Sequence, residues 1–165
     1  GGQGAVYRVD LSQDIPIVQV AIKEPIADAK TIPVGDIQTF LDEAETWQTV
    51  DQREREKQRW EDSEHIVGVI DTGDSLPWIA MEYMDGGGLD HRLESNPNGL
   101  PVDEALWFGE CICRGVELAH SYGIAHLDLK PANILFRETN PSQWDVPKIA
   151  DWGLARILAK QSGTM

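Results

Sequence analysis

His126 to Leu135 read HLDLKPANIL, the most informative ten residues of the chain. They place a carboxylate, an ammonium group and an amide, at Asp128, Lys130 and Asn133, directly before the apolar run 134–136. That run has the length and branching of a strand, so the polar side chains are predicted to lie on one short loop. Phosphoryl transfer needs a group that orients the attacking hydroxyl, a cation beside the phosphate, and oxygen ligands for magnesium. The loop can supply one of each.

This loop resembles the catalytic loop of eukaryotic-type serine/threonine protein kinases, with Leu127 where that family usually has arginine. Two further parts of the family signature occur in the expected order. Residues 20–23 read VAIK, which is similar to the strand whose lysine holds the α and β phosphates of ATP. Residues 148–153 read KIADWG, which is similar to the metal-binding DFG segment with tryptophan replacing phenylalanine. The order of these matches makes coincidence improbable and indicates a kinase.

The resemblance implies a role in phosphoryl transfer for each charged or amide side chain of these motifs. Asp128 would orient the substrate hydroxyl and accept its proton, and Lys130 would neutralise charge on the γ phosphate. Asn133 and Asp151 would coordinate Mg²⁺. The remaining pair is Lys23 and Glu43, in which the glutamate would hold the lysine that binds the α and β phosphates, with Glu45 as the alternative partner.

The resemblance also implies a set of nucleotide contacts. The first residues look like the end of a glycine-rich phosphate loop, in which Gly1 and Gly4 would be the second and third glycines. The adenine ring would lie between apolar side chains, and its edge would meet backbone groups of the segment that joins the two lobes. The predicted nucleotide-binding residues are Gly1, Gly2, Gln3, Gly4, Val6, Ala21, Lys23, Met81, Glu82, Met84 and Leu135.

The predicted fold is α+β with two lobes. Residues 1–84 would form an antiparallel β lobe, with strands at 5–10, 17–23, 65–72 and 76–84 and one amphipathic helix from Asp36 to Val50. Residues 85–165 would form the first part of a mainly helical lobe, with helices at 89–94 and 102–122 and a surface loop between Phe136 and Lys148. The family's later segments would follow Met165, so we expect an incomplete kinase domain with weak activity at best.

Composition narrows the class of protein. The chain has 165 residues and is 41% hydrophobic, which suits a globular protein with a core. Its 28 acidic and 14 basic residues give a formal net charge of −14, which argues against nucleic-acid binding because phosphate backbones require basic patches. Such an acidic balance is typical of proteins adapted to concentrated salt. No apolar run reaches the ~20 residues of a membrane helix, and we expect a cytoplasmic protein.

Some cysteine and histidine residues are predicted to have structural rather than catalytic or metal-binding roles. Cys111 and Cys113 lack a second pair with which to complete a zinc site, and two-residue spacing on a helix points them to different faces. His126 is predicted to be packed and hydrogen-bonded rather than a proton shuttle. The resemblance places four residues in the packed column that links kinase lobes: Trp47, Val69, His126 and Trp152.

Two other functions remain open at this point. A pseudokinase, a nucleotide-binding scaffold without transfer activity, would usually lack one of Lys23, Asp128, Asn133 or Asp151, and all four are present. A small-molecule phosphotransferase of the same fold would rarely carry the DLKPxN pattern. The predicted function is therefore transfer of the γ phosphate of Mg-ATP to a serine or threonine of a protein substrate.

Overall fold

The structure is a computed structural model of the whole chain. It describes residues 4–10, 19–25, 38, 42, 45–47, 65–73, 78–138, 145–152 and 156–157. Gly1, Gly2, Gln3 and Glu43 lie outside the described residues, as does the side chain of Val6. Most of the predicted helix from Asp36 to Val50 lies outside them too.

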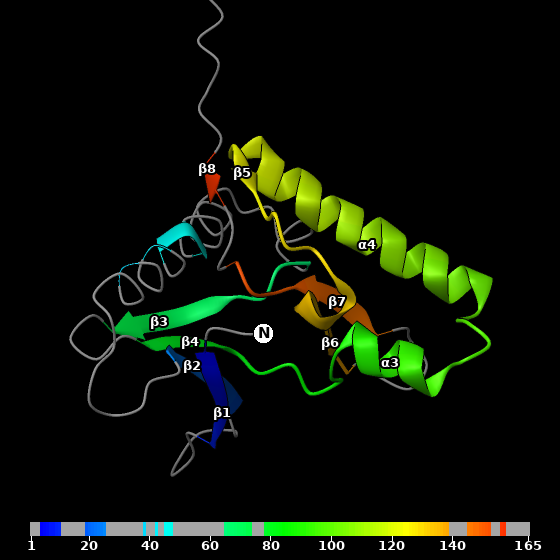
Figure 1. Cartoon of the computed structure of the whole chain (residues 1–165), viewed down its shortest axis with the longest axis horizontal. Coiled ribbons are helices and arrows are strands. Elements are labelled where there is room, and N and C mark those ends of the chain that lie inside the picture. Colours follow the sequence, from blue (N-terminus) through cyan, green and yellow to red (C-terminus); the bar gives the residue numbers. More distant parts are fainter. Residues whose placement is uncertain are drawn as a thin grey trace, which may run out of the picture.

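One end of the molecule is a four-stranded antiparallel sheet in the order β1-β2-β4-β3 (Figure 1). Its strands are β1 (Gly4–Asp10), β2 (Gln19–Pro25), β3 (Val69–Gly73) and β4 (Trp78–Glu82). Ala21 of β2 pairs with Met81 of β4, and Ile79 to Met81 are buried, as expected for a central strand. Strand β3 begins four residues after its predicted start at 65, β4 ends two residues before its predicted end at 84, and β2 continues two residues past its predicted end at 23.

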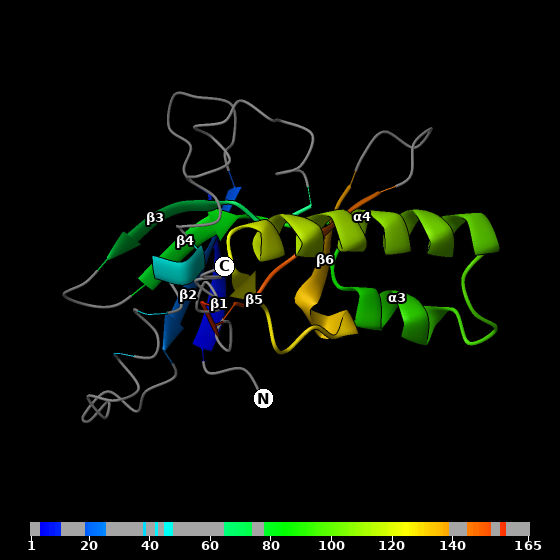
Figure 2. The same ribbon diagram turned by 90° about the horizontal axis from the view of Figure 1, so that it is seen from above.

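The other end of the molecule is mainly helical, as Figures 1 and 2 both show. Helices α3 (Leu89–Ser95) and α4 (Val102–Ser121) lie close to their predicted positions. Next along the chain come β5 (Ile124–Ala125), the 3-10 turn η1 (Pro131–Asn133), β6 (Ile134–Arg137), β7 (Val146–Ile149) and β8 (Arg156–Ile157). Acidic residues in the first turn of α4, Asp103 and Glu104, favour the positive end of the helix dipole.

The surface loop predicted between Phe136 and Lys148 was wrong at both ends. Phe136 pairs with Pro147, and Arg137 pairs with Val146, so β6 and β7 form an antiparallel ladder. Pro147, inside the predicted loop, is buried rather than exposed, and Lys148, which follows the loop, is buried as well. The two prolines and the tryptophan of this segment suggested a loop, but packing against α4 determined the strand.

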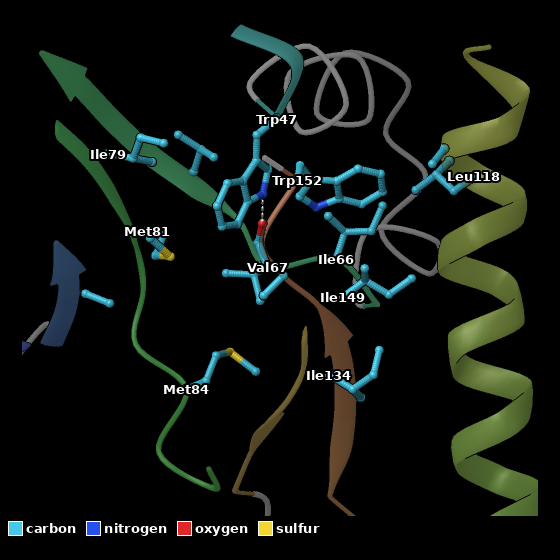
Figure 3. Packing of buried hydrophobic residues seen from close by; sticks show 14 of the residues in the cluster. Trp47, Ile66, Val67, Ile79, Met81, Met84, Leu118, Ile134, Ile149 and Trp152 are labelled. Carbon is cyan, nitrogen blue, oxygen red and sulfur yellow. Dashed lines mark hydrogen bonds between the residues drawn. The ribbon is translucent and has the colours of Figure 1, made fainter. Parts of the chain in front are cut away.

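One hydrophobic core joins both ends of the molecule (Figure 3). Val67 is fully buried at its centre, and its carbonyl accepts a 2.6 Å hydrogen bond from the indole N–H of Trp47. Trp152 and Leu118, from the helical end, belong to the same cluster. Because one cluster spans both ends, separating them would expose apolar surface, which is unfavourable in water.

Glycines fix the hinge, the segment Tyr83–Gly88 that connects β4 to α3. Gly86 donates to the carbonyl of Phe136, and the Phe136 N–H donates to Gly87. A Cβ at Gly86 would lie 2.8 Å from the Phe136 Cβ, and Gly87 has a φ of +70°, which favours glycine. The hinge therefore runs directly against β6, the strand that follows the catalytic loop.

The two glycines of α4 provide a matched test of this packing. A Cβ at Gly115 would lie 2.8 Å from the His65 carbonyl oxygen and 2.9 Å from Ile149 Cδ1, whereas a Cβ at Gly109 meets nothing within 4 Å. We expect Gly115→Ala to lower the free energy of unfolding by about 1–3 kcal/mol. Gly109→Ala should raise it by about 0.5–1 kcal/mol because alanine favours helix. Denaturant melts measure the free energy of unfolding of both variants. Equal changes in the two variants would contradict the close packing around Gly115.

Candidate active site

A cavity of about 360 Å³ lies where the sheet meets the helical end. The sheet, the hinge, η1, β6 and the segment after β7 all contribute side chains to its wall. Its lining residues are Ala21, Lys23, Trp47, Met81, Glu82, Tyr83, Met84, Ala132, Asn133, Leu135, Ala150 and Asp151. Most of the wall is apolar, and a few polar groups converge within it, which is the usual form of a ligand site.

An ion pair between a buried lysine and a partly exposed aspartate lies in this cavity wall. Lys23 in β2 is only 6% exposed, and its Nζ donates a 2.8 Å hydrogen bond to Oδ1 of Asp151, 128 residues along the chain. Lysine is rarely buried unless paired, so this contact explains how β2 tolerates it. Asp151 has a φ of +61°, a conformation that is costly for residues other than glycine and is often found at functional sites.

The catalytic loop forms a compact polar cluster. Lys130 Nζ donates to Asp128 Oδ2 at 2.5 Å, and Asn133 Nδ2 donates to the carbonyl and to Oδ2 of Asp128, at 2.9 and 3.2 Å. The hydrogen bond from Lys130 holds the pKa of Asp128 below its ordinary value of 3.8, and the same bond raises the pKa of Lys130. Asp128 is therefore an ionised acceptor at neutral pH, as a group that takes a proton must be.

His126 connects the catalytic loop to the segment that carries Asp151. Its Nδ1 accepts from the N–H of Asp128 at 3.3 Å, so its Nε2 is the nitrogen that donates to the Ala150 carbonyl at 3.0 Å. The ring lies 4.7 Å from that of Trp152, which is 1% exposed. The predicted packed and hydrogen-bonded role of His126 is confirmed, and the ring orients Asp128 through the backbone.

The predicted site residues fall into three groups. Ala21, Lys23, Met81, Glu82, Met84, Leu135, Asn133 and Asp151 line the cavity. Asp128 and Lys130 lie beside it, joined to it through Asn133. The pairing of Lys23 with Glu43 falls outside the described residues, as do the contacts of Gly1, Gly2, Gln3 and the Val6 side chain.

Four cavity residues were not predicted to contact a nucleotide. Tyr83, Ala132 and Ala150 each lie next to a predicted residue, so neighbourhood in sequence was the available signal. Trp47 was assigned only to the packed column, yet it also reaches the cavity wall. Its dual position follows from the indole bond to Val67, which fixes the ring between core and cavity.

Comparison with known proteins identifies this arrangement. The sequence profile of the protein kinase domain matches residues 4–165, nearly the entire chain. The chain belongs to the protein kinase domain family. The kinase-like α+β fold agrees with this membership, and the family uses ATP and a divalent metal ion.

Bacterial serine/threonine kinases are among the relatives of this kinase domain. The chain is 36% identical over 100 residues to the serine/threonine-protein kinase PknB of Mycobacterium leprae, covering 57% of the chain and 15% of that protein. It is 36% identical over 102 residues to the probable serine/threonine-protein kinase PknB of Lactococcus lactis, covering 61% and 15%. The matched region is thus 15% of the length of each of these relatives.

The donor set of the kinase site suits a hard divalent ion. Asn133 and Asp151 provide amide and carboxylate oxygens on one cavity wall, and oxygen is the donor that such ions prefer. Among the described residues no group of three or more His, Cys, Asp or Glu side chains could hold a metal ion alone. No described helix has both the length and the apolar character needed to cross a membrane.

The burial of His126 predicts a pH dependence of stability. Burial lowers its pKa below the ordinary value of 6.5. In the pH range just below 6.5 the unfolded chain therefore binds more protons than the folded chain, and the free energy of unfolding falls as the pH falls.

Urea melts at intervals from about pH 7.5 to about pH 5.5 measure this slope. We expect His126→Asn to flatten the slope in that range. The control is His91→Asn, which replaces a histidine whose side chain is 81% exposed and should leave the slope in place. An unchanged slope in His126→Asn would contradict the assignment.

Proposed function

We propose that this kinase domain transfers the γ phosphate of ATP to serine or threonine hydroxyls of a protein substrate. The observation that carries the proposal is the hydrogen-bonded cluster of Asp128, Lys130 and Asn133 beside a cavity that ends at Lys23 and Asp151. Lys23, Asp128, Asn133 and Asp151, of which a pseudokinase usually lacks at least one, are all present, which favours an active enzyme over a nucleotide-binding scaffold. The names of the bacterial relatives support the same class.

The proposed chemistry depends on where each side chain is held. Asp128 Oδ2 accepts hydrogen bonds from Lys130 and Asn133, so the carboxylate keeps its charge while a substrate hydroxyl approaches. It orients that hydroxyl and accepts its proton as the new phosphorus–oxygen bond forms. Lys130 is 43% exposed at its side chain and can leave Asp128 to contact the transferred phosphate. Positioning and charge, not covalent catalysis, provide the rate enhancement.

The nucleotide would occupy the described cavity. Ala21 of β2 and Leu135 of β6 provide apolar surface for the two faces of the adenine ring, and Met81 closes the wall toward the sheet. Lys23 lies at the end where the α and β phosphates would bind. Asn133 and Asp151 would hold Mg²⁺, which neutralises phosphate charge and aligns the leaving group when bound.

Replacement of Asp128 tests the proposal. Asp128→Asn keeps the size of the side chain and its place in the loop but removes the charge that accepts the proton. We expect the turnover number to fall by about 10²–10⁴, with little change in the melting temperature. The measurement is transfer of labelled γ phosphate from Mg-ATP to a basic protein mixture.

Asp103→Asn is the control, because Asp103 is an exposed carboxylate in the first turn of α4. It should leave turnover unchanged. Transfer by the Asp128→Asn protein at the rate of the unaltered protein would exclude Asp128 as the base. Binding of ATP with no transfer by the unaltered protein would favour a pseudokinase.

A further inference from the structure

The side chain of Glu82 is the meeting point of three separate segments. Glu82 ends β4, lines the cavity and precedes the hinge. Its Oε1 accepts a 2.7 Å hydrogen bond from the N–H of Gly68 and a 2.6 Å bond from Lys148 Nζ, and its Oε2 accepts a 2.6 Å bond from Arg137. The Glu82 N–H also donates to the Gly68 carbonyl at 3.0 Å. One residue of the cavity wall is thus held from several sides.

The two cationic partners of Glu82 lie in strands that adjoin the catalytic loop and Asp151. Arg137 ends β6, the strand that continues directly from Asn133 and the catalytic loop. Lys148 lies in β7, three residues before Asp151. Glu82 therefore ties the cavity wall to the strand leaving the catalytic loop and to the strand leading to the metal-binding aspartate.

The ion pair between Glu82 and Lys148 lies mostly out of contact with water. The Lys148 side chain is only 7% exposed, and that of Glu82 is 21% exposed. Burial alone would raise the pKa of Glu82, but the charge and hydrogen bonds of Lys148, with those of Gly68 and Arg137, lower it overall. The carboxylate is therefore ionised at neutral pH, and replacing Lys148 alone would remove the charge that does most to lower its pKa.

We infer that the Glu82 side chain is a positioning residue that aligns the hinge with Asn133 and Asp151 for nucleotide binding. Backbone groups of the hinge and oxygens of Asn133 and Asp151 must contact opposite ends of the same nucleotide. The bonds from Lys148 and Arg137 to Glu82 fix the separation of these two ends before the ligand arrives. This inference rests on the proposed function and adds a role for a side chain whose predicted contribution was backbone only.

A double replacement separates alignment from stability. Lys148→Met alone leaves Glu82 buried without its main partner and should lower the melting temperature. The Glu82→Met/Lys148→Met double variant removes both charges and should recover most of that loss, since apolar pairs replace buried ion pairs with little cost. It does not restore the connection between hinge and strands.

The test is calorimetric binding of the non-hydrolysable analogue AMP-PNP with Mg²⁺, together with the Michaelis constant for ATP and the turnover number. We expect the double variant to bind AMP-PNP roughly tenfold more weakly, as it would if the aligned hinge were populated about a tenth of the time. The loss should fall mainly on the Michaelis constant. The control is Glu110→Met/Arg114→Met, which removes an exposed ion pair on α4 and should bind normally.

Recovery of both melting temperature and AMP-PNP affinity by the double variant would overturn the inference and leave a structural ion pair. A higher turnover number at an unchanged Michaelis constant would overturn it as well.

If the double variant does not recover its melting temperature, Arg137→Met decides, because that side chain is 50% exposed and its loss leaves the pair of Glu82 and Lys148 in place. Binding about 1.5- to 5-fold weaker would support the inference, and unchanged binding would overturn it. If the unaltered chain binds no AMP-PNP, the proposed function fails and this inference fails with it; normal binding by both the unaltered chain and the variants contradicts this inference alone.

Discussion

The ion pair between Lys23 and Asp151 is the interaction on which the rest of this structure depends. A lysine that is 6% exposed in a sheet strand needs an anion, and this one meets a carboxylate supplied from the opposite end of the chain. The sheet and the helical end must therefore come together at this point. The cavity lies at that junction, so the same contact that satisfies a buried charge also defines where a triphosphate can bind.

The polar contacts around the cavity form a connected frame. His126 bonds to Ala150 and Asp128, and the Ala150 N–H donates to the Asn133 carbonyl. Asp128, Asn133 and Asp151 are thus held relative to one another by backbone and imidazole hydrogen bonds before any ligand binds. Such preorganisation lowers the cost of arranging groups during reaction, and the core around Val67 gives the frame rigid support.

The chemical side chains could be predicted from sequence, because the order of short motifs specifies them directly. The loop 126–135, the VAIK strand and the DWG segment identified Lys23, Asp128, Asn133 and Asp151, and the structure brings these four together. Departures from the family motifs could also be identified from the sequence. One of them is Leu127, which the structure shows to be 61% exposed with a φ of +62°. Cys111 is buried and Cys113 is exposed, which agrees with the prediction that their helical spacing points them to different faces.

Contacts between distant residues could not be predicted in this way. Lys148 was assigned only as the first residue of the KIADWG segment, and its pairing with Glu82, 66 residues away, has no periodic or motif signal. The cavity position of Trp47 depends on a hydrogen bond to a backbone carbonyl, which any residue could offer. The pairing of Lys23 with Glu43 stays a prediction.

The central claim is that Lys23 and Asp151 form one end of a nucleotide site. Calorimetric titration of the chain with Mg-AMP-PNP, repeated with Lys23→Met, tests it most directly. Loss of a charged hydrogen-bond donor to the phosphates should weaken binding by about 10- to 100-fold in a variant that still unfolds cooperatively. Equal affinity of a folded Lys23→Met protein and the unaltered chain would contradict the claim.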